Sequence, residues 1–308
     1  MKVYQAAFAP GVFKKYHKQF PEDKLNILLS YANTDYSVEF FCIKNRDKIG
    51  GIIEDSGTWS ANHSKSLYPG SVTLGGYISY LLTSEELYGY PIFDETFSFD
   101  IDHSNRGFGI NYQNYLEMTG AGLSPTYVIH DIYGDEINYF IDMGCKRIAL
   151  GSAHIKTPKT LDYVMNKLKS AGVSVHLFGH TKFALLADFP INSCDSAGWA
   201  YTGAFGSIKV WNPKKDGVNK TDQIYLEEYD NTGIKHKITL SNYEYRDDLE
   251  NFLHDTFNMS SWDLLTAQDP GSYKKMLINT HYYVQLEKIV NQIHKEKGFN
   301  TGFNVKNK

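Results

Sequence analysis

The sequence predicts an α/β fold: a (β/α)8 barrel with a helical C-terminal extension. Two observations carry this prediction. Short apolar or β-branched runs recur along the first two-thirds of the 308 residues, and several are separated by segments with helical periodicity. Strands that alternate with helices form βαβ units and a parallel sheet, and eight such strands are the number a closed barrel needs.

The expected strands are runs of five to seven residues, each followed by turn residues. They are 26–32, 51–55, 96–102, 126–130, 147–151, 174–178, 191–195 and 207–211. No GxGxxG motif follows any of these runs, which disfavours a dinucleotide-binding open sheet, the next choice for such a pattern.

Two helices between the strands have clear boundaries. Residues 135–143 place Ile137, Phe140 and Ile141 at helical spacing, and the pattern stops at Gly144. Residues 157–171 open with Thr-Pro and stop at a glycine, the usual start and end signals of a helix.

The pattern changes after residue 211. Residues 211–245 are polar and rich in turn residues, which predicts a β-hairpin, and residues 245–258 and 272–297 look helical. Since no repeat, low-complexity tract or Pro-rich linker interrupts the chain, we expect a single domain over 1–308. Its barrel strands would span about 25–211, and a C-terminal hairpin and helical closure would span 212–308.

Composition favours a soluble, intracellular globular protein. Hydrophobic residues make up 42% and charged residues 21% of the chain, as in ordinary globular domains. The longest apolar run is too short to cross a membrane, and the N-terminus lacks the features of a secretory leader. Three scattered cysteines make neither a disulfide framework nor a zinc knuckle. A net charge of −4 argues mildly against a general nucleic-acid coat but permits local basic patches.

Polar residues at the predicted strand ends are the candidates for chemistry, because barrel active sites lie at the carboxyl ends of the strands. Asp55 and Asp195 stand out, since each ends a strand and is followed by small or hydroxyl residues. Two carboxylates facing one site suit a double-displacement glycosyl transfer, in which one attacks the anomeric carbon and the other moves a proton.

Five segments together resemble the tRNA-guanine transglycosylase superfamily, in particular its branch that exchanges guanine in DNA for a 7-deazaguanine. They are ILLSYAN (27–33), EDSGTWSA (54–61), YFIDMGCKRIALGSA (139–153), VHLFGHTKFALLADFPINSCDSAGW (175–199) and GAFGSIKVW (203–211). The resemblance covers roughly residues 25–211 and depends on the order and spacing of the segments.

The resemblance implies the catalytic pair. Asp195 matches the nucleophilic aspartate of the family, and Asp55 matches the aspartate that moves the proton in its D-S-G motif. The implied reaction exchanges one N-glycosidic bond for another through a covalent aspartyl–glycosyl ester, so neither a redox cofactor nor ATP is expected.

The resemblance also implies the residues that hold the base. Trp59 matches a ring stacked on the base, and Asp100, with Asp102 as a rival on the same strand face, matches the aspartate that reads the guanine edge. His130 stands where the tRNA enzymes carry a glutamine. The remaining matches are Gly151 and Ser152, whose segment reads the base through its backbone, and Phe178 on the other face.

Two departures favour DNA over tRNA as substrate. The tRNA enzymes have a C-terminal zinc site of three cysteines and a histidine, whereas no cysteine follows Cys194 here, so no structural zinc is expected. Their arginine- and glycine-rich segment after the nucleophile is replaced by AGWAYTGAFG. The expected partners are DNA and a free 7-deazaguanine base, in the cytoplasm of a bacterium or a phage-infected host, with no membrane. Lys209, Lys214 and Lys215 are the candidate phosphate contacts.

Three alternatives remain open. The first is an enzyme of the same family that acts on RNA, and the second is a non-catalytic nucleic-acid-binding barrel in which both aspartates are structural. The third is a metal-dependent barrel hydrolase built on the strand-end histidines, which are His103, His130, His154, His176 and His180. Loose His/Asp spacing disfavours the hydrolase. The 7-substituent of the inserted base, the DNA context and strandedness, and the oligomeric state are not predicted.

Overall fold

A computed structural model describes residues 1–33, 35–63, 72–151, 157–226 and 238–301. Its contacts group into two compact units: unit 1 comprises residues 1–8, 24–196 and 291–308, and unit 2 comprises residues 9–23 and 197–290. The sequence had suggested one domain over 1–308. Among the described residues, no helix is both long and apolar enough to span a membrane.

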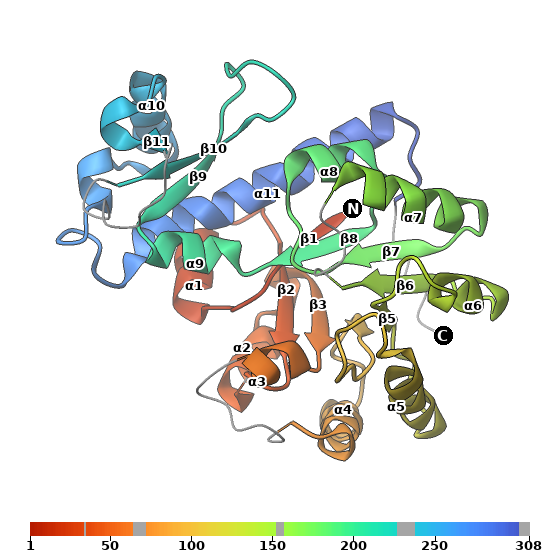
Figure 1. The fold of residues 1–308 in the computed structure, drawn as a ribbon. Helices are drawn as coiled ribbons and strands as arrows, with labels where there is room; N and C mark the ends of the chain where they lie inside the picture. Colours follow the sequence, from red (N-terminus) through yellow and green to blue (C-terminus); the bar gives the residue numbers. More distant parts are fainter. Residues whose placement is uncertain (34, 64–71, 152–156, 227–237, 302–308) are drawn as a thin grey trace. The chain divides into compact units, whose positions relative to one another are not determined.

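Unit 1 is built on one parallel sheet of eight strands, in the order β4-β3-β2-β1-β8-β7-β6-β5. The strands are β1 (Lys2–Gln5), β2 (Leu25–Ser30), β3 (Ile49–Asp55), β4 (Glu95–Thr96), β5 (Tyr127–Ile129), β6 (Arg147–Leu150), β7 (Ser174–Leu177) and β8 (Ser193–Ser196). Figure 1 shows β1, β8 and β7 side by side. The predicted α/β fold with an eight-stranded parallel sheet is confirmed.

The first strand of the sheet and the last predicted strand both differ from the prediction. Lys2–Gln5 was not expected to be a strand, yet β1 pairs with β2 on one side and with β8 on the other. The predicted last strand, 207–211, belongs instead to a separate three-stranded sheet in unit 2. Both runs are short and mix polar with apolar residues, so only long-range pairing decides which one joins the parallel sheet.

The two outer strands, β4 and β5, meet at one point. A single parallel bridge pairs Phe97 with Thr126. Thr126 N donates to Thr96 O at 2.8 Å, and Ser98 N donates to Thr126 O at 2.9 Å. The sheet is therefore curled, and its two edges meet at this bridge without a full strand ladder.

Helices and short turns connect the strands of unit 1. They are α2 (Tyr36–Lys44), η1 (Arg46–Lys48), α3 (Thr58–His63), α4 (Leu74–Tyr88), α5 (Phe108–Gly120), α6 (Glu136–Asp142), α7 (Pro158–Ser170) and α8 (Phe183–Asp188). The predicted helices over 135–143 and 157–171 are confirmed as α6 and α7. Thr157 caps α7, since its side chain accepts a hydrogen bond from Thr160 N.

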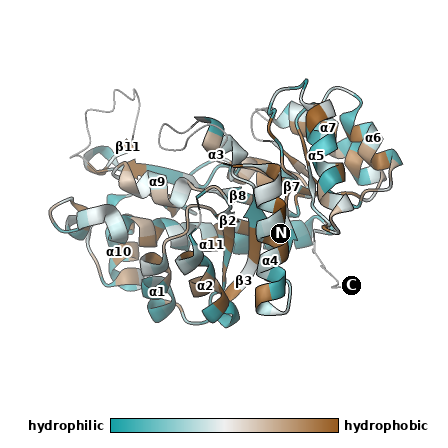
Figure 2. Ribbon diagram, turned by 90° about the horizontal axis from the view of Figure 1, so that it is seen from below, coloured by the Kyte–Doolittle hydropathy of each residue, from teal (hydrophilic) through white to brown (hydrophobic). Residues whose placement is uncertain are grey.

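The inner face of the sheet is filled by six buried side chains, which lie on or directly after β1 to β6. They are Tyr4, Leu28, Ile53, Phe97, Val128 and Ala149, with Ala6 and Phe178 packed against them. Figure 2 shows hydrophobic and hydrophilic residues mixed along α7, as expected of a helix with one buried face. This part of the interior is thus a packed apolar core.

Unit 2 combines the predicted hairpin with helices. Its elements are α1 (Pro10–Gln19), α9 (Gly198–Ala204), β9 (Ser207–Trp211), β10 (Thr221–Tyr225), β11 (Ile238–Thr239), η3 (Leu240–Asn242), α10 (Arg246–Phe257), η4 (Ser261–Leu264), η5 (Pro270–Ser272) and α11 (Tyr273–Glu296), whose last residues group with unit 1. β9 and β10 pair antiparallel as a hairpin. The helices predicted over 245–258 and 272–297 are confirmed as α10 and α11.

A buried ion pair anchors the start of α11. The side chain of Lys275 is fully buried, and its Nζ lies 2.9 Å from Asp269 Oδ2 and 2.8 Å from Leu264 O. Asp269 also accepts from the backbone N–H groups of Lys274 and Lys275 and so caps the helix.

We expect Lys275→Met to lower the free energy of unfolding by about 3 kcal/mol, because it leaves the Asp269 charge buried without its cation. Chemical denaturation measures this loss. The matched control is Lys274→Met, which breaks the partly exposed pair with Asp263 and should cost less than about 1 kcal/mol. Equal losses for the two variants would contradict the assignment.

Candidate active site

Four of the predicted site residues lie at the carboxyl ends of strands in unit 1. Asp55 is the last residue of β3, and Asp195 lies near the end of β8. Asp100 follows β4, and His130 comes directly after β5. Because all these strands run parallel, their carboxyl ends lie on the same edge of the sheet.

Asp195 is held by one of its two oxygens. The backbone N–H of Gly179 donates to Asp195 Oδ1 at 2.9 Å, and His176 Nε2 lies 3.4 Å from the same oxygen. Gly179 follows β7 with φ +65°, a conformation that suits glycine. None of the residues that the structure describes donates to Oδ2. The buried carboxylate therefore has one fixed oxygen and one open oxygen.

The turn that follows Asp55 depends on the glycine of the D-S-G motif. Gly57 N donates to Asp55 Oδ2 at 3.0 Å. Gly57 has φ +75°, and a Cβ there would overlap Ser30 Oγ and Ala32 Cβ. A glycine is thus required at this turn, because it lets β3 bend sharply into α3 while the backbone contacts the carboxylate.

The charge state of Asp55 depends on its neighbours. Desolvation at the strand end is the largest cause that raises the pKa of Asp55 to about 7, and the negative charges of Asp100 and Asp195 add to it. The three carboxylates are therefore close enough to influence one another. A carboxyl group with a pKa near 7 can both give and take a proton at neutral pH.

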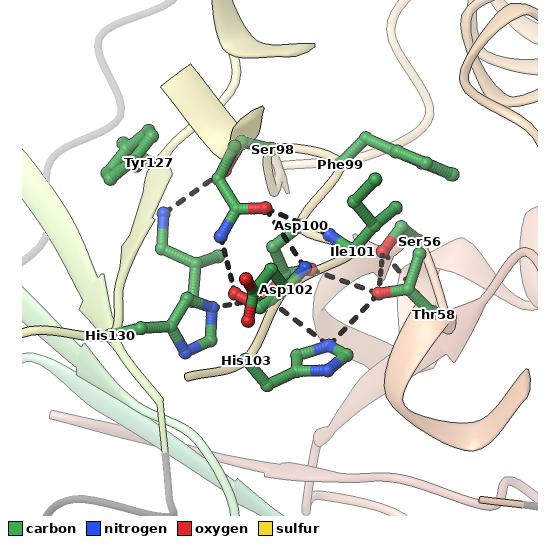
Figure 3. A network of polar contacts seen from close by, with 12 residues as sticks. Ser56, Thr58, Ser98, Phe99, Asp100, Ile101, Asp102, His103, Tyr127 and His130 are labelled. Carbon is green, nitrogen blue, oxygen red and sulfur yellow. Dashed lines mark hydrogen bonds and ion pairs between the residues drawn. The ribbon is translucent and has the colours of Figure 1, made fainter. Parts of the chain in front are cut away.

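Asp100 is at the centre of a polar network (Figure 3). Its Oδ2 lies 2.8 Å from His130 Nε2 and 3.8 Å from His103 Nε2, and Thr58 Oγ1 donates to Oδ1 at 3.1 Å. Asp102, its sequence rival, instead accepts from Ser104 N at 2.9 Å and caps the loop. Of the two aspartates, the structure places Asp100 in the network with His130.

The loop that carries His130 is fixed from behind by Glu136 at the start of α6. Glu136 Oε2 accepts from the backbone N–H groups of His130, at 3.0 Å, and Asp131, at 2.7 Å, and its Oε1 accepts from Tyr127 OH at 2.9 Å. His130 is therefore positioned through its backbone as well as through Asp100.

Gly151, at the end of β6, makes room for the His130 ring. A Cβ at Gly151 would lie 2.8 Å from His130 Nδ1 and 3.0 Å from Cε1. Ser152, the next residue expected in the site, lies outside the described residues.

Two aromatic residues are the remaining predicted base-binding residues. Trp59, at the start of α3, is 48% exposed, and its ring lies edge-on to His103 with centroids 5.1 Å apart. Phe178 packs against Phe97 and His176, with centroids 4.6 Å apart in both cases. Trp59 thus offers a ring surface, whereas Phe178 is part of the inner core.

The three candidate phosphate-binding lysines lie in unit 2 and have partners there. Lys209 Nζ donates to Tyr283 OH at 3.2 Å. Lys214 pairs with Asp248 at 2.6 Å, and Lys215 pairs with the buried Asp222 at 2.5 Å. Of these, Lys214 is the most exposed.

Sequence reasoning missed Thr58 and Gly179, and it considered His103 and His176 only as metal ligands. The signal for His176 was its alternation with Phe178 on one strand, which places both on the inner face. The described residues contain no group of three or more His, Cys, Asp or Glu that could share a metal ion. His154, another candidate ligand of the hydrolase alternative, lies outside them.

Comparison with known proteins identifies no relative. No protein-family model matches the chain, and neither a curated protein nor a solved structure matches it.

We expect Gly151→Ala to displace His130 from Asp100 and to lower the free energy of unfolding by about 2 kcal/mol, since a buried hydrogen bond to a charged group is lost. Thermal or chemical denaturation measures the loss. In a His130→Ala background the added methyl group has room, so Gly151→Ala should then cost much less. Additive losses in the double variant would show that the two residues do not compete for space.

We expect Asp55→Asn to stabilise the fold by an amount that grows between about pH 4 and about pH 7. Below about pH 4 the carboxyl is neutral in both the folded and the unfolded chain, and asparagine mimics it. From there to about pH 7 the unfolded wild type gives up this proton while the folded protein keeps it, so the folded wild type loses stability as pH rises. Above about pH 7 the gain of the variant levels off at about 2 kcal/mol, after discounting for partial exposure. Melting curves at pH about 4 and about 8 test this, and a gain of the same size at both pH values would contradict the raised pKa.

Proposed function

We propose that the chain is a base-exchange glycosyltransferase that replaces guanine in DNA with a 7-deazaguanine through a covalent aspartyl–glycosyl intermediate. The observation that carries the proposal is the pair of carboxylates at one sheet edge with different environments. Asp195 has one oxygen held and one open, and Asp55 titrates near neutral pH. A nucleophile and a proton carrier need these two environments.

In the first half-reaction, Asp195 Oδ2 attacks C1′ of the deoxyribose. The C1′–N9 bond breaks with its electron pair going to guanine, and protonated Asp55 supplies the proton that the leaving base takes up. The sugar is then bound to the enzyme as an ester, and guanine departs as a neutral base. The target nucleotide must be unpaired or flipped out of the helix for this attack.

In the second half-reaction the proton moves back. The incoming 7-deazaguanine gives its N9 proton to ionised Asp55, and N9 attacks C1′ while the ester bond to Asp195 breaks. A pKa of about 7 serves both directions, because Asp55 must be an acid in one step and a base in the next. The reaction needs no ATP or redox cofactor.

The Asp100 network suits recognition of a guanine-like base. Asp100 accepts hydrogen bonds only, as needed opposite the N1–H and N2–H groups of guanine. His130 and Thr58 orient it from two sides. The half-exposed Trp59 ring offers a stacking surface beside the network, and such stacking typically contributes about 1–3 kcal/mol per base.

The proposal extends to fold, substrate and location. We take the curled sheet to work as a closed (β/α)8 barrel, supported by the Phe97–Thr126 bridge between its edges. DNA is preferred to RNA because no cysteine follows Cys194 to build the zinc site of the tRNA enzymes. We propose the cytoplasm as the location of the protein, because DNA and free bases are both present there. Lys209, Lys214 and Lys215 stay candidate phosphate contacts, with Lys214 the most accessible.

We expect Asp195→Asn to abolish guanine release and covalent attachment to DNA, because an amide is a poor nucleophile. Asp55→Asn should slow insertion of the new base by about 100-fold or more while some attack continues, so that a DNA–protein adduct accumulates. Denaturing gels with labelled guanine-containing DNA detect the adduct, and nucleoside mass spectrometry with candidate 7-deazaguanines detects insertion. Asp102→Asn is the matched control and should behave like the wild type.

The same assays separate the alternatives. Exchange on tRNA but not on DNA would make the chain an RNA enzyme. Stoichiometric zinc together with hydrolase activity would favour the metal-dependent barrel hydrolase. DNA binding without any exchange in the wild type would make it a binding module. An adduct in Asp195→Asn but not in Asp55→Asn would invert the two roles.

A further inference from the structure

A continuous chain of buried polar groups ends at Asp195. Arg147 on β6 pairs with Glu95 on β4, and Arg147 Nη2 donates to Ser193 Oγ on β8 at 2.7 Å. Ser193 Oγ lies 2.8 Å from His176 Nδ1 on β7, and His176 Nε2 lies 3.4 Å from Asp195 Oδ1. These side chains come from β6, β7 and β8, which are adjacent in the sheet of unit 1, and from β4 at one of its edges. The sequence resemblance assigned a role to Asp195 alone.

The contacts fix which ring nitrogen of His176 carries the proton. Arginine can only donate, so the Arg147 contact occupies a lone pair of Ser193 and leaves the hydroxyl proton free. Among the described residues, that proton has no acceptor other than His176 Nδ1. If Nδ1 accepts, the neutral ring carries its proton on Nε2, which faces the carboxylate. The other tautomer would set two lone pairs against each other.

Packing alone does not explain a histidine at this position. His176 is fully buried, and its ring lies 4.8 Å from that of Phe97 and 4.6 Å from that of Phe178, centroid to centroid. Tyr4 lies on a further side, at 6.4 Å. An aromatic hydrocarbon would fill this space without the cost of burying polar nitrogens. The imidazole therefore needs a reason other than shape.

The charges around Asp195 supply that reason. Asp55 faces it from β3, and the two carboxylates repel each other strongly enough to help raise the pKa of Asp55. A nucleophilic Asp195 must nevertheless stay ionised. Among the described residues, the Gly179 N–H donates to Asp195 Oδ1, and the buried His176 Nε2, which forms no hydrogen bond there, lies 3.4 Å from the same oxygen. Both contacts are to Oδ1, and neither reaches Oδ2.

We propose that His176 is a positioning residue for Asp195, whose Nε2–H, set by Ser193 and Arg147, attracts Oδ1 across the 3.4 Å contact and so turns Oδ2 toward the sugar. The catalytic part of this inference rests on the proposed function. The electrostatic part does not, because the contact exists in the free protein. No bond to His176 forms or breaks during the reaction, and its proton stays on Nε2.

The first experiment measures the contact without any substrate. Carboxyl-labelled aspartate gives a carbon NMR signal for Asp195, assigned by its loss in Asp195→Asn. In His176→Phe the pH midpoint of its titration should rise, because the carboxylate loses the Nε2–H dipole that lies 3.4 Å from Oδ1. His176→Gln, which keeps an N–H donor, should restore most of the shift. Nitrogen labelling of histidine should show the Nε2–H tautomer for His176, and Ser193→Ala should weaken that preference.

The second experiment measures adduct formation with guanine-containing DNA at several pH values. The rate in His176→Phe should fall about tenfold or more at every pH, because Asp195 Oδ2 is no longer held toward the sugar. DNA affinity should stay unchanged. His281→Phe, which replaces another buried histidine surrounded by aromatic rings in unit 2, is the matched control and should change neither the midpoint nor the rate.

The outcomes distinguish this inference from the proposed function. An unchanged titration midpoint in His176→Phe overturns the inference whatever the substrate is, as does finding the proton on Nδ1. If the midpoint shifts but wild-type protein forms no adduct with DNA, the electrostatic role stands and the proposed function fails. If wild type and His176→Phe form adduct equally fast at all pH values, the positioning role in catalysis is overturned while the function stands.

Discussion

Repulsion among three carboxylates at one edge of a parallel sheet is the constraint on which this site depends. Asp55, Asp100 and Asp195 each end or follow a strand, and the structure accommodates each differently. Asp100 is surrounded by donors from Thr58 and His130. Asp195 accepts a backbone hydrogen bond on one oxygen. Asp55 accepts the Gly57 N–H, but burial and then repulsion from Asp100 and Asp195 raise its pKa to about 7. The three carboxylates therefore differ in their hydrogen bonds and in their readiness to take up a proton.

The residue that precedes Asp55 on β3 carries a further buried carboxyl group. Glu54 is fully buried on β3, and none of the described residues forms a hydrogen bond to its carboxyl oxygens. Burial, followed by the negative charges of Asp55 and Glu39, raises the pKa of Glu54 well above its usual range. The site therefore favours the neutral form of this carboxyl group, which limits the negative charge next to Asp55.

Small residues make this crowding possible. Gly57 lets the backbone contact Asp55, Gly151 leaves space for the His130 ring, and Gly179 points its N–H at Asp195. Each lies just past a strand end, where the chain must turn and where a side chain would fill the space used by a functional group. Behind them, Glu136 and the Arg147–Ser193–His176 chain fix the site from inside the fold. The site is therefore held as much by the sheet interior as by its loops.

The sequence by itself determined the local features. Thr157 and Pro158 start α7 because their own side chains favour a helix N-terminus, and Asp55 ends β3 because the apolar run of that strand stops there. Tertiary structure decided everything that depends on distant partners. β1 is a strand because it lies between β2 and β8, which are far along the chain, whereas 207–211 pairs with β10 instead. Asp100 and Asp102 share a strand face in sequence, and only the positions of His130 and Thr58 distinguish them. Periodicity reports the burial of a segment but not its neighbours, and the ionisation of a carboxyl group is set by its neighbours.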